Sequence, residues 1–232
     1  MRHHLYAIVD RLPGRWRPPT AGIGGAAVVP RRLDDLVVVS SLIDAVPPAN
    51  PRTLALHQDI VATVIDARAT LPFRYGAAVP AMELPAWLAR HRAAVTGALK
   101  TVRGCVEMTV KLLRLEGAIT PGLAQPVRPG PGERELRALA EALVERAGLP
   151  QWRYQPAGSA GNVAAAVAFL VPRADLAGFL SRIAPVASHA TGVAVVPTGP
   201  WPPYSFVPEL GRPPLSGVSA AGPADLVGRP AS

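Results

Sequence analysis

Cysteine is nearly absent from this sequence of 232 residues, and Cys105 is its only example. A single cysteine excludes an internal disulfide and a cysteine-rich zinc or iron–sulfur site, so we expect Cys105 to be a small buried residue. Long apolar runs are also missing. The longest, 163–171, has nine residues and ends at Pro172. A membrane-spanning helix needs ~18 residues or more, so no membrane span is predicted.

The beginning of the sequence lacks the pattern of a secretory signal. Arg2 precedes an apolar run at 5–9, and Asp10 ends this run before it reaches the length of a signal-peptide core. We therefore expect the protein to be cytoplasmic.

Lysine is scarce as well, since 22 of the 24 basic residues are arginines. The formal net charge is +8, and the arginines are spread from Arg2 to Arg229 without aromatic residues clustered among them. Nucleic-acid-binding surfaces combine clustered basic residues with aromatic side chains, so no specific nucleic acid is expected as a partner. Scattered arginines still attract polyanions, and a basic polyanion-binding module stays an alternative function.

Apolar residues make up 49% of the chain, which is enough for a packed core. In the first part of the chain, β-branched runs predict strands and helical spacing predicts helices. Asn50 and Pro51 form a typical helix start, and Pro72 favours an edge strand. The expected strands lie at 5–9, 26–29, 36–40 and 71–76, and the expected helices at 52–67 and 84–101.

The clearest strand is predicted at 105–113, where apolar and polar residues alternate. Its apolar face consists of Val106, Met108, Val110 and Leu112. We expect this face to pack on the helices at 52–67 and 84–101.

Residues 117–132 contain four prolines and four glycines, a composition typical of a linker. Beyond it we expect helices at 133–147 and 174–183 and strands at 152–155, 163–171 and 192–196. Helices mixed with strands in two blocks predict an α+β protein made of two small α/β-sandwich domains. Its expected parts are an N-terminal ferredoxin-like domain at 1–116, the linker at 117–132, a C-terminal α+β domain with a Pro-rich strap at 133–207, and a flexible tail at 208–232.

No catalytic, cofactor-binding or metal-binding residues are predicted. The five histidines show neither the spacing of a zinc site nor a nucleophile beside them. His57 with Asp59, and His91 with Glu83, come nearest to a dyad, but surface or half-buried helix histidines are the favoured interpretation. The glycine-rich loop at 22–25 lacks the Gly-Lys-Ser/Thr ending of a phosphate-binding loop.

The segment at 198–207, Thr-Gly-Pro-Trp-Pro-Pro-Tyr-Ser-Phe-Val, is unusually rigid, because its prolines fix φ and remove amide donors. Its aromatic residues Trp201, Tyr204 and Phe206 present large apolar faces and are the candidate partner-binding residues. They either pack as a strap on the second domain or also form a docking surface. We expect Trp201 to be structural and Tyr204 or Phe206 to lie nearer a partner.

Four motifs stand out along the chain: Tyr-Ala-Ile-Val (6–9), Leu-Pro-Phe-Arg-Tyr-Gly (71–76), Val-Glu-Met-Thr-Val-Lys (106–111) and the segment at 198–207. Together they resemble those of the gas-vesicle accessory proteins of the GvpL/GvpF family. They occur in the family's order, and the last is the most specific. The motif residues expected to have structural roles are Pro72, Arg74, Gly76, Glu107, Lys111, Gly199, Pro200, Pro202 and Pro203.

The resemblance implies a non-enzymatic, two-domain α+β protein without cofactors that is needed to assemble gas vesicles, the hollow shells that give cells buoyancy. It implies binding to the small apolar shell protein, to other gas vesicle accessory proteins, or to both, and a location with the gas vesicles in the cytoplasm. An exposed sheet edge and an apolar groove would hold such an aggregation-prone subunit reversibly. Nucleation, chaperoning and shell attachment all stay open as roles.

Overall fold

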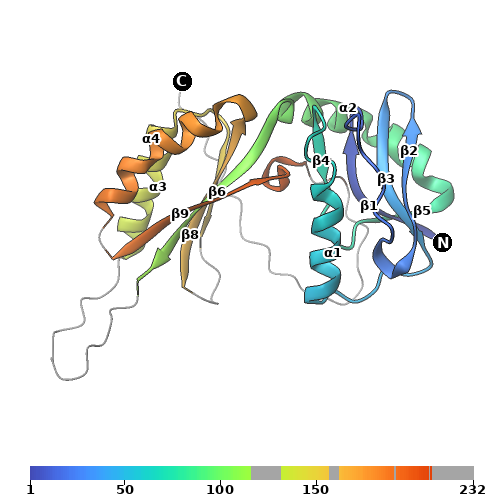
Figure 1. Ribbon diagram of the computed structural model, residues 1–232, viewed down its shortest axis with the longest axis horizontal. Helices are drawn as coiled ribbons and strands as arrows, with labels where there is room; N and C mark the ends of the chain where they lie inside the picture. Colours follow the sequence, from blue (N-terminus) through green and yellow to red (C-terminus); the bar gives the residue numbers. More distant parts are fainter. Residues whose placement is uncertain (116–131, 157–161, 191, 209, 211–232) are drawn as a thin grey trace. The chain divides into compact units, whose positions relative to one another are not determined.

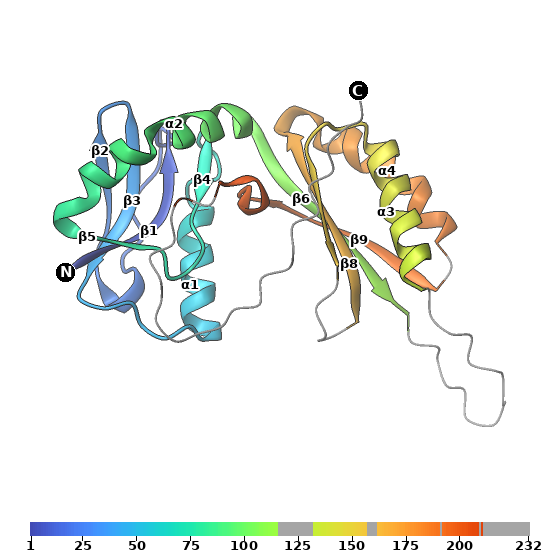
Figure 2. The ribbon, with the colours of Figure 1, turned by 180° about the vertical axis from the view of Figure 1, so that it is seen from behind.

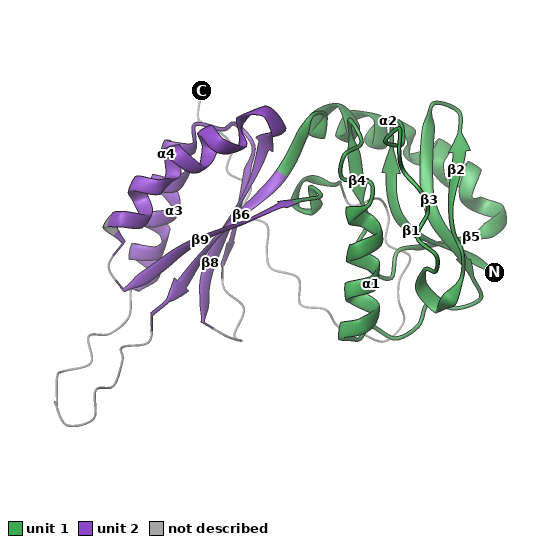
Figure 3. Cartoon of the chain, in the orientation of Figure 1, with its two compact units in different colours: residues 1–106, 201–219 green, residues 107–200, 220–232 purple. Residues whose placement is uncertain are grey.

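The chain forms two compact units (Figure 3), which we describe separately. The computed structural model describes residues 1–115, 132–156, 162–190, 192–208 and 210. Unit 1 contains Met1–Val106 and the segment that begins at Trp201, whereas unit 2 contains the chain from Glu107 to Pro200. The chain therefore leaves unit 1, builds unit 2 and returns.

Unit 1 is an antiparallel sheet with α1 on one face and α2 on the other (Figures 1 and 2). The strand order is β2-β3-β1-β4, and β5 also pairs with β1. Pro72 lies in β4 at the end of this order, the edge position that its missing amide hydrogen favours. The elements are β1 (Arg2–Val9), β2 (Val28–Leu33), β3 (Leu36–Ile43), α1 (Pro51–Ala62), β4 (Thr70–Pro72), β5 (Ala78–Pro80) and α2 (Leu84–Val102).

The helix α1 begins where the sequence predicts it. The side chain of Asn50 accepts a hydrogen bond from the Thr53 amide, and the Thr53 hydroxyl accepts one from the Asn50 amide, both at 3.0 Å. This reciprocal cap satisfies two amides that the first turn leaves without helical partners. The inward residues Ile60 and Val61 then pack against β1 and β3 in one apolar core.

Unit 2 has the element order β6-α3-β7-β8-α4-β9, with the strand order β7-β8-β6-β9. Both helices lie on the same face of its sheet (Figures 1 and 2). This βαββαβ order is typical of ferredoxin-like domains. The elements are β6 (Cys105–Arg114), α3 (Glu133–Ala147), β7 (Trp152–Pro156), β8 (Val163–Pro172), α4 (Leu176–His189) and β9 (Val193–Trp201).

The strand β6 belongs mainly to unit 2, which corrects its expected place in an N-terminal domain at 1–116. Met108, Val110 and Leu112 are buried with residues of α3, β8 and α4, so the expectation that they pack on the two N-terminal helices was wrong. Alternation shows that one strand face is buried, but it carries no information on which helices cover it. The ferredoxin-like order accordingly occurs in unit 2, while in unit 1 β1, β2 and β3 follow one another without an intervening α-helix.

Two other predicted parts lie almost wholly outside the described residues. They are the linker at 117–132 and the tail at 208–232. Within the described ranges, no helix is both long enough and apolar enough to cross a membrane.

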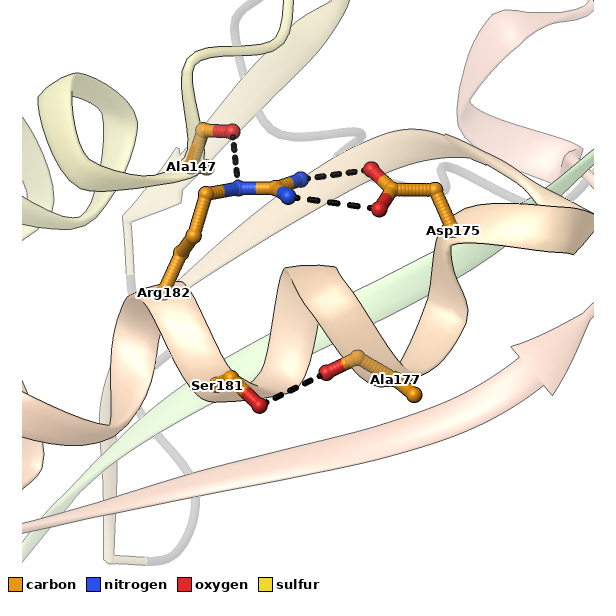
Figure 4. Close-up of polar contacts among 5 residues, drawn as sticks. All are labelled: Ala147, Asp175, Ala177, Ser181 and Arg182. Carbon is orange, nitrogen blue, oxygen red and sulfur yellow. Dashed lines mark hydrogen bonds and ion pairs between the residues drawn. The ribbon is translucent and has the colours of Figure 1, made fainter.

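A polar clamp joins α3 to α4 in unit 2 (Figure 4). Arg182 Nε donates to the carbonyl oxygen of Ala147 at 3.1 Å, and its two terminal nitrogens pair with the Asp175 carboxylate at 3.3 and 2.7 Å. Arg182 thus satisfies one of the last carbonyls of α3, which have no helical partner. The clamp needs a glycine at 178, because a Cβ there would collide with Oδ1 of Asp175.

We expect the effect of Gly178→Ala on the melting temperature to have opposite signs with aspartate and with alanine at position 175. In the wild type the new methyl displaces the Asp175 carboxylate from Arg182, so the melting temperature falls. In an Asp175→Ala background the nearest remaining atom is Arg182 Nη1 at 3.1 Å, and the terminal nitrogens of Arg182 no longer have a carboxylate partner. Alanine favours a helix by up to ~1 kcal/mol over glycine, so the melting temperature rises. Thermal melting of the four chains measures this, and shifts of the same sign in both backgrounds would contradict the clamp.

Candidate functional site

A pocket of about 260 Å³ in unit 1 gathers side chains from distant parts of the sequence. Two of its residues, Arg74 and Tyr75, come from the motif at 71–76. A third, Tyr204, comes from the motif at 198–207 and lies in a short 3-10 helix, η4 (Tyr204–Phe206). The pocket is lined by Leu54, His57, Gln58, Arg74, Tyr75 and Tyr204.

The segment that carries Arg74 and Tyr75 is held at both ends. The Phe73 amide donates to the carbonyl oxygen of Tyr6 at 2.8 Å, which extends the pairing of β4 with β1 by one bond. The Tyr75 hydroxyl donates to the carbonyl oxygen of Pro47 at 2.8 Å. Gly76 has φ +92°, a conformation that favours glycine, and it turns the chain towards β5.

Two buried histidines form a hydrogen-bonded chain behind this segment. His57 Nε2 lies 2.7 Å from the Phe73 carbonyl oxygen, which can only accept, so Nε2 carries the proton and Nδ1 is an acceptor. His4 Nε2 lies 3.0 Å from this Nδ1 and therefore donates to it. The remaining ring nitrogen, His4 Nδ1, is buried and has no hydrogen-bond partner among the described residues.

Burial keeps both histidines neutral. It lowers the pKa of His4 to about 3, with a smaller contribution from the neighbouring His57. Burial also lowers the pKa of His57, and the hydrogen bond to the Phe73 carbonyl opposes that shift in part. Tyr6 and Tyr75 surround the pair, with ring centroids 5.1 and 5.3 Å from that of His4. The two histidines and the two tyrosines thus form an uncharged aromatic cluster behind the pocket.

We expect unit 1 to lose stability as the pH falls below the usual histidine pKa of 6.5. Below that pH, His4 of the unfolded chain is protonated, whereas His4 of the folded chain stays neutral until the pH approaches 3. The loss amounts to at most ~1.4 kcal/mol per pH unit for this residue. Urea unfolding between about pH 7.5 and pH 4.5 measures it. His4→Gln is the control, because its amide still donates to His57 but does not titrate, and equal slopes in both chains would contradict the prediction.

The comparison with known families decides what kind of protein this is. The family model described as gas vesicle synthesis protein GvpL/GvpF matches residues 2–126 and 132–208. The chain belongs to the GvpL/GvpF family. The resemblance carried by the four motifs is therefore confirmed. No curated protein sequence matches the chain.

Two solved structures share the fold of this GvpL/GvpF protein. The crystal structure of the gas vesicle protein GvpF from Anabaena sp. PCC7120 matches with a TM-score of 0.68 at 14% identity, covering 89% of this chain and 98% of that one. The crystal structure of GvpF from Microcystis aeruginosa matches with a TM-score of 0.69 at 13% identity, covering 89% and 99%. At these identities the likeness concerns the fold, and the predicted α+β class is confirmed.

From Trp201 onwards the strap of this GvpL/GvpF protein belongs to unit 1, whereas we expected it to close the second domain. Tyr204 packs half-buried against the core of unit 1, next to Tyr75. Phe206 is buried at 8% exposure, while Trp201 is 50% exposed, so Trp201 is the most accessible of the three aromatic residues. Gly199 has φ +128°, as a glycine that turns the chain should, Pro200 is exposed, and Pro202 and Pro203 are buried.

The remaining motif residues do not join the pocket. Glu107 and Lys111 lie in β6, on the strand face opposite the core of unit 2. Glu107 is buried and its Oε1 accepts a hydrogen bond from the Thr109 hydroxyl at 3.3 Å, whereas Lys111 is half-buried. Their unit differs from that of the pocket, so we place them outside the site.

Sequence reasoning named five residues of the site in no functional role: His4, Leu54, His57, Gln58 and Tyr75. We expected His57 at the surface or half-buried, yet it is buried. The signal was present, because position 57 precedes the buried positions 60, 61 and 64 at helical spacing. His91 is half-buried as expected, with Nδ1 donating to the Trp87 carbonyl at 2.8 Å. The described part of the chain contains no group of three potential metal ligands.

Proposed function

We propose that this GvpL/GvpF protein is a non-enzymatic accessory protein that binds the small apolar gas vesicle shell protein, other gas vesicle accessory proteins, or both, during assembly in the cytoplasm. The observation that supports this most is the meeting of two family motifs, at 71–76 and 198–207, in one pocket of unit 1. A docking role suits the pocket better than catalysis, because both ring nitrogens of His57 are already engaged.

The residue types around the pocket also favour protein binding. Protein interfaces are rich in tyrosine, tryptophan and arginine, and those residues dominate binding energies. The pocket contains Arg74, Tyr75 and Tyr204, and the half-exposed Trp201 stands three residues before Tyr204. Leu54 adds an apolar side chain that is 39% exposed. An apolar, self-associating subunit would find here both aromatic surface and a pocket.

Capture of purified shell protein by alanine variants of the strap tests the proposal. Trp201→Ala should reduce capture about tenfold or more with nearly normal melting, because its side chain is half exposed. Phe206→Ala should instead lower stability by ~2–5 kcal/mol, because its side chain is buried. Tyr204→Ala should show both effects, since this half-buried residue lines the pocket.

Met82→Ala is the matched control, because Met82 is the most exposed large apolar residue of the described chain and does not line the pocket. It should leave capture and melting unchanged. The same experiment with other gas vesicle accessory proteins as bait separates the two kinds of partner. Normal capture of every bait by the Trp201 and Tyr204 variants would remove the strap from partner binding.

A further inference from the structure

Two of the ring side chains that line the pocket in unit 1 have their polar atoms already engaged. Both ring nitrogens of His57 are engaged, one with His4 and one with the Phe73 carbonyl. The Tyr75 hydroxyl is engaged with the Pro47 carbonyl. These two side chains therefore present mainly ring surface to the pocket, and Leu54 adds aliphatic surface. This part of the pocket lining is therefore mainly apolar.

Two polar side chains at the pocket differ from these. Arg74 and Gln58 are exposed, and neither the Arg74 guanidinium nor the Gln58 amide has a hydrogen bond or ion pair within the described residues. A guanidinium offers five N–H donors in a fixed plane that matches a carboxylate, and the amide of Gln58 offers two more. Among the described residues, no acidic side chain lines the pocket to neutralise Arg74. The charge of the pocket is therefore complementary to an anionic group.

The volume of the pocket bears on whether the anionic ligand is a small molecule or part of a protein. Sites for metabolites and cofactors typically occupy 300–1,000 Å³, and this pocket has about 260 Å³. The pocket is thus near the lower end of that range and is large enough for one large side chain of a protein partner, the usual anchor of a protein interface.

We propose that the pocket binds one large apolar side chain of a partner protein, and that Arg74 and Gln58 bind a carboxylate carried beside that side chain. The inference rests on the proposed function in taking the occupant to be a protein, and it adds the chemistry of the segment. It also gives Arg74 a role in recognition, beyond the structural role that the sequence suggests.

N-acetylphenylalanine is a minimal probe, because it combines an aromatic side chain with a carboxylate. N-acetylphenylalaninamide is the matched probe without the charge. Titrating each into the full chain, with NMR shifts of the His57, Tyr75 and Tyr204 rings as readout, should show the carboxylate binding about tenfold more tightly than the amide. Arg74→Gln should remove that difference, whereas Arg90→Gln, which alters an exposed arginine outside the pocket, should preserve it.

Several results would overturn the proposal. They are equal binding of the two probes, shifts confined to residues outside the pocket, no binding of either probe, or an unchanged preference in Arg74→Gln. Sedimentation of the chain alone adds a further test. A dimer that N-acetylphenylalanine dissociates would overturn the proposed occupant in favour of a second copy of this chain. Failure of these titrations with normal shell-protein capture would leave the proposed function intact and place docking elsewhere.

Discussion

Replacing Val110 with aspartate should unfold unit 2 and leave unit 1 folded. Val110 is fully buried in the core that β6, β8, α3 and α4 share. An unpaired carboxylate in that core costs several kcal/mol, and the whole stability of a domain is only ~5–15 kcal/mol. Hydrogen exchange read by mass spectrometry should show loss of protection in β7, β8 and α4, with β1 and β3 still protected.

Arg114→Asp is the control for this change, because it places the same group on the same strand at an exposed position. It should alter stability by no more than ~0.5 kcal/mol. The distribution of lost protection is informative by itself. Loss in β1 and β3 with protection kept in unit 2 would support the sequence-based expectation that β6 completes the N-terminal domain, against the packing described above.

The second large effect is expected from Gly22→Ala in unit 1. Gly22 lies directly before a 3-10 helix, η1 (Ile23–Gly25), and faces the buried hydrogen bond between the Tyr6 hydroxyl and Ser41 Oγ, which is 2.9 Å long. An added Cβ would lie 2.5 Å from the Tyr6 oxygen and closer still to Ser41 Oγ. Relieving the overlap must also disturb the bond from the Ile23 amide to the Tyr6 hydroxyl. Overpacking and lost hydrogen bonds together should cost ~2–5 kcal/mol in urea unfolding.

Two variants make this expectation specific to the contact. Gly14→Ala adds the same methyl to the same loop, where nothing lies within 4 Å, and it should be nearly neutral. Ser41→Ala removes the nearest obstacle, so the double variant Gly22→Ala/Ser41→Ala should lose less stability than the two single changes added together. If the losses of unfolding free energy simply add, or if Gly22→Ala is neutral, the loop can move to accept the methyl group without a loss of stability.

Most elements could be predicted from local patterns. The helix α3 spans the predicted 133–147, and α2 and β6 differ from their predictions by one residue at one end. Errors occurred where tertiary contacts overrule local signals. The helix α4 was expected to stop at 183, before Pro185, yet it continues to His189 with Val186 buried in the core of unit 2. The strand β5 has three residues, too few for a periodic pattern.

The site shows the same division. The motifs included Arg74, Tyr204 and the other aromatic residues of the strap. No pattern in the sequence, however, linked the segments at 71–76 and 198–207. That link depends on the return of the chain to unit 1 after β9, which is a long-range contact. The pairing of His4 with His57 likewise joins a strand and a helix that lie far apart in sequence.

By itself, the sequence determined the α+β class, the family and nearly all of the helices and strands, because each depends on residue types and spacings within short windows. The tertiary structure decided which unit β6 completes, where the strap packs and which side chains form the pocket. An alternating sequence pattern indicates that one face of a strand is buried. Which element covers that face depends on the path of the chain in three dimensions. For this GvpL/GvpF protein, that path brings residues of two separate motifs into one pocket.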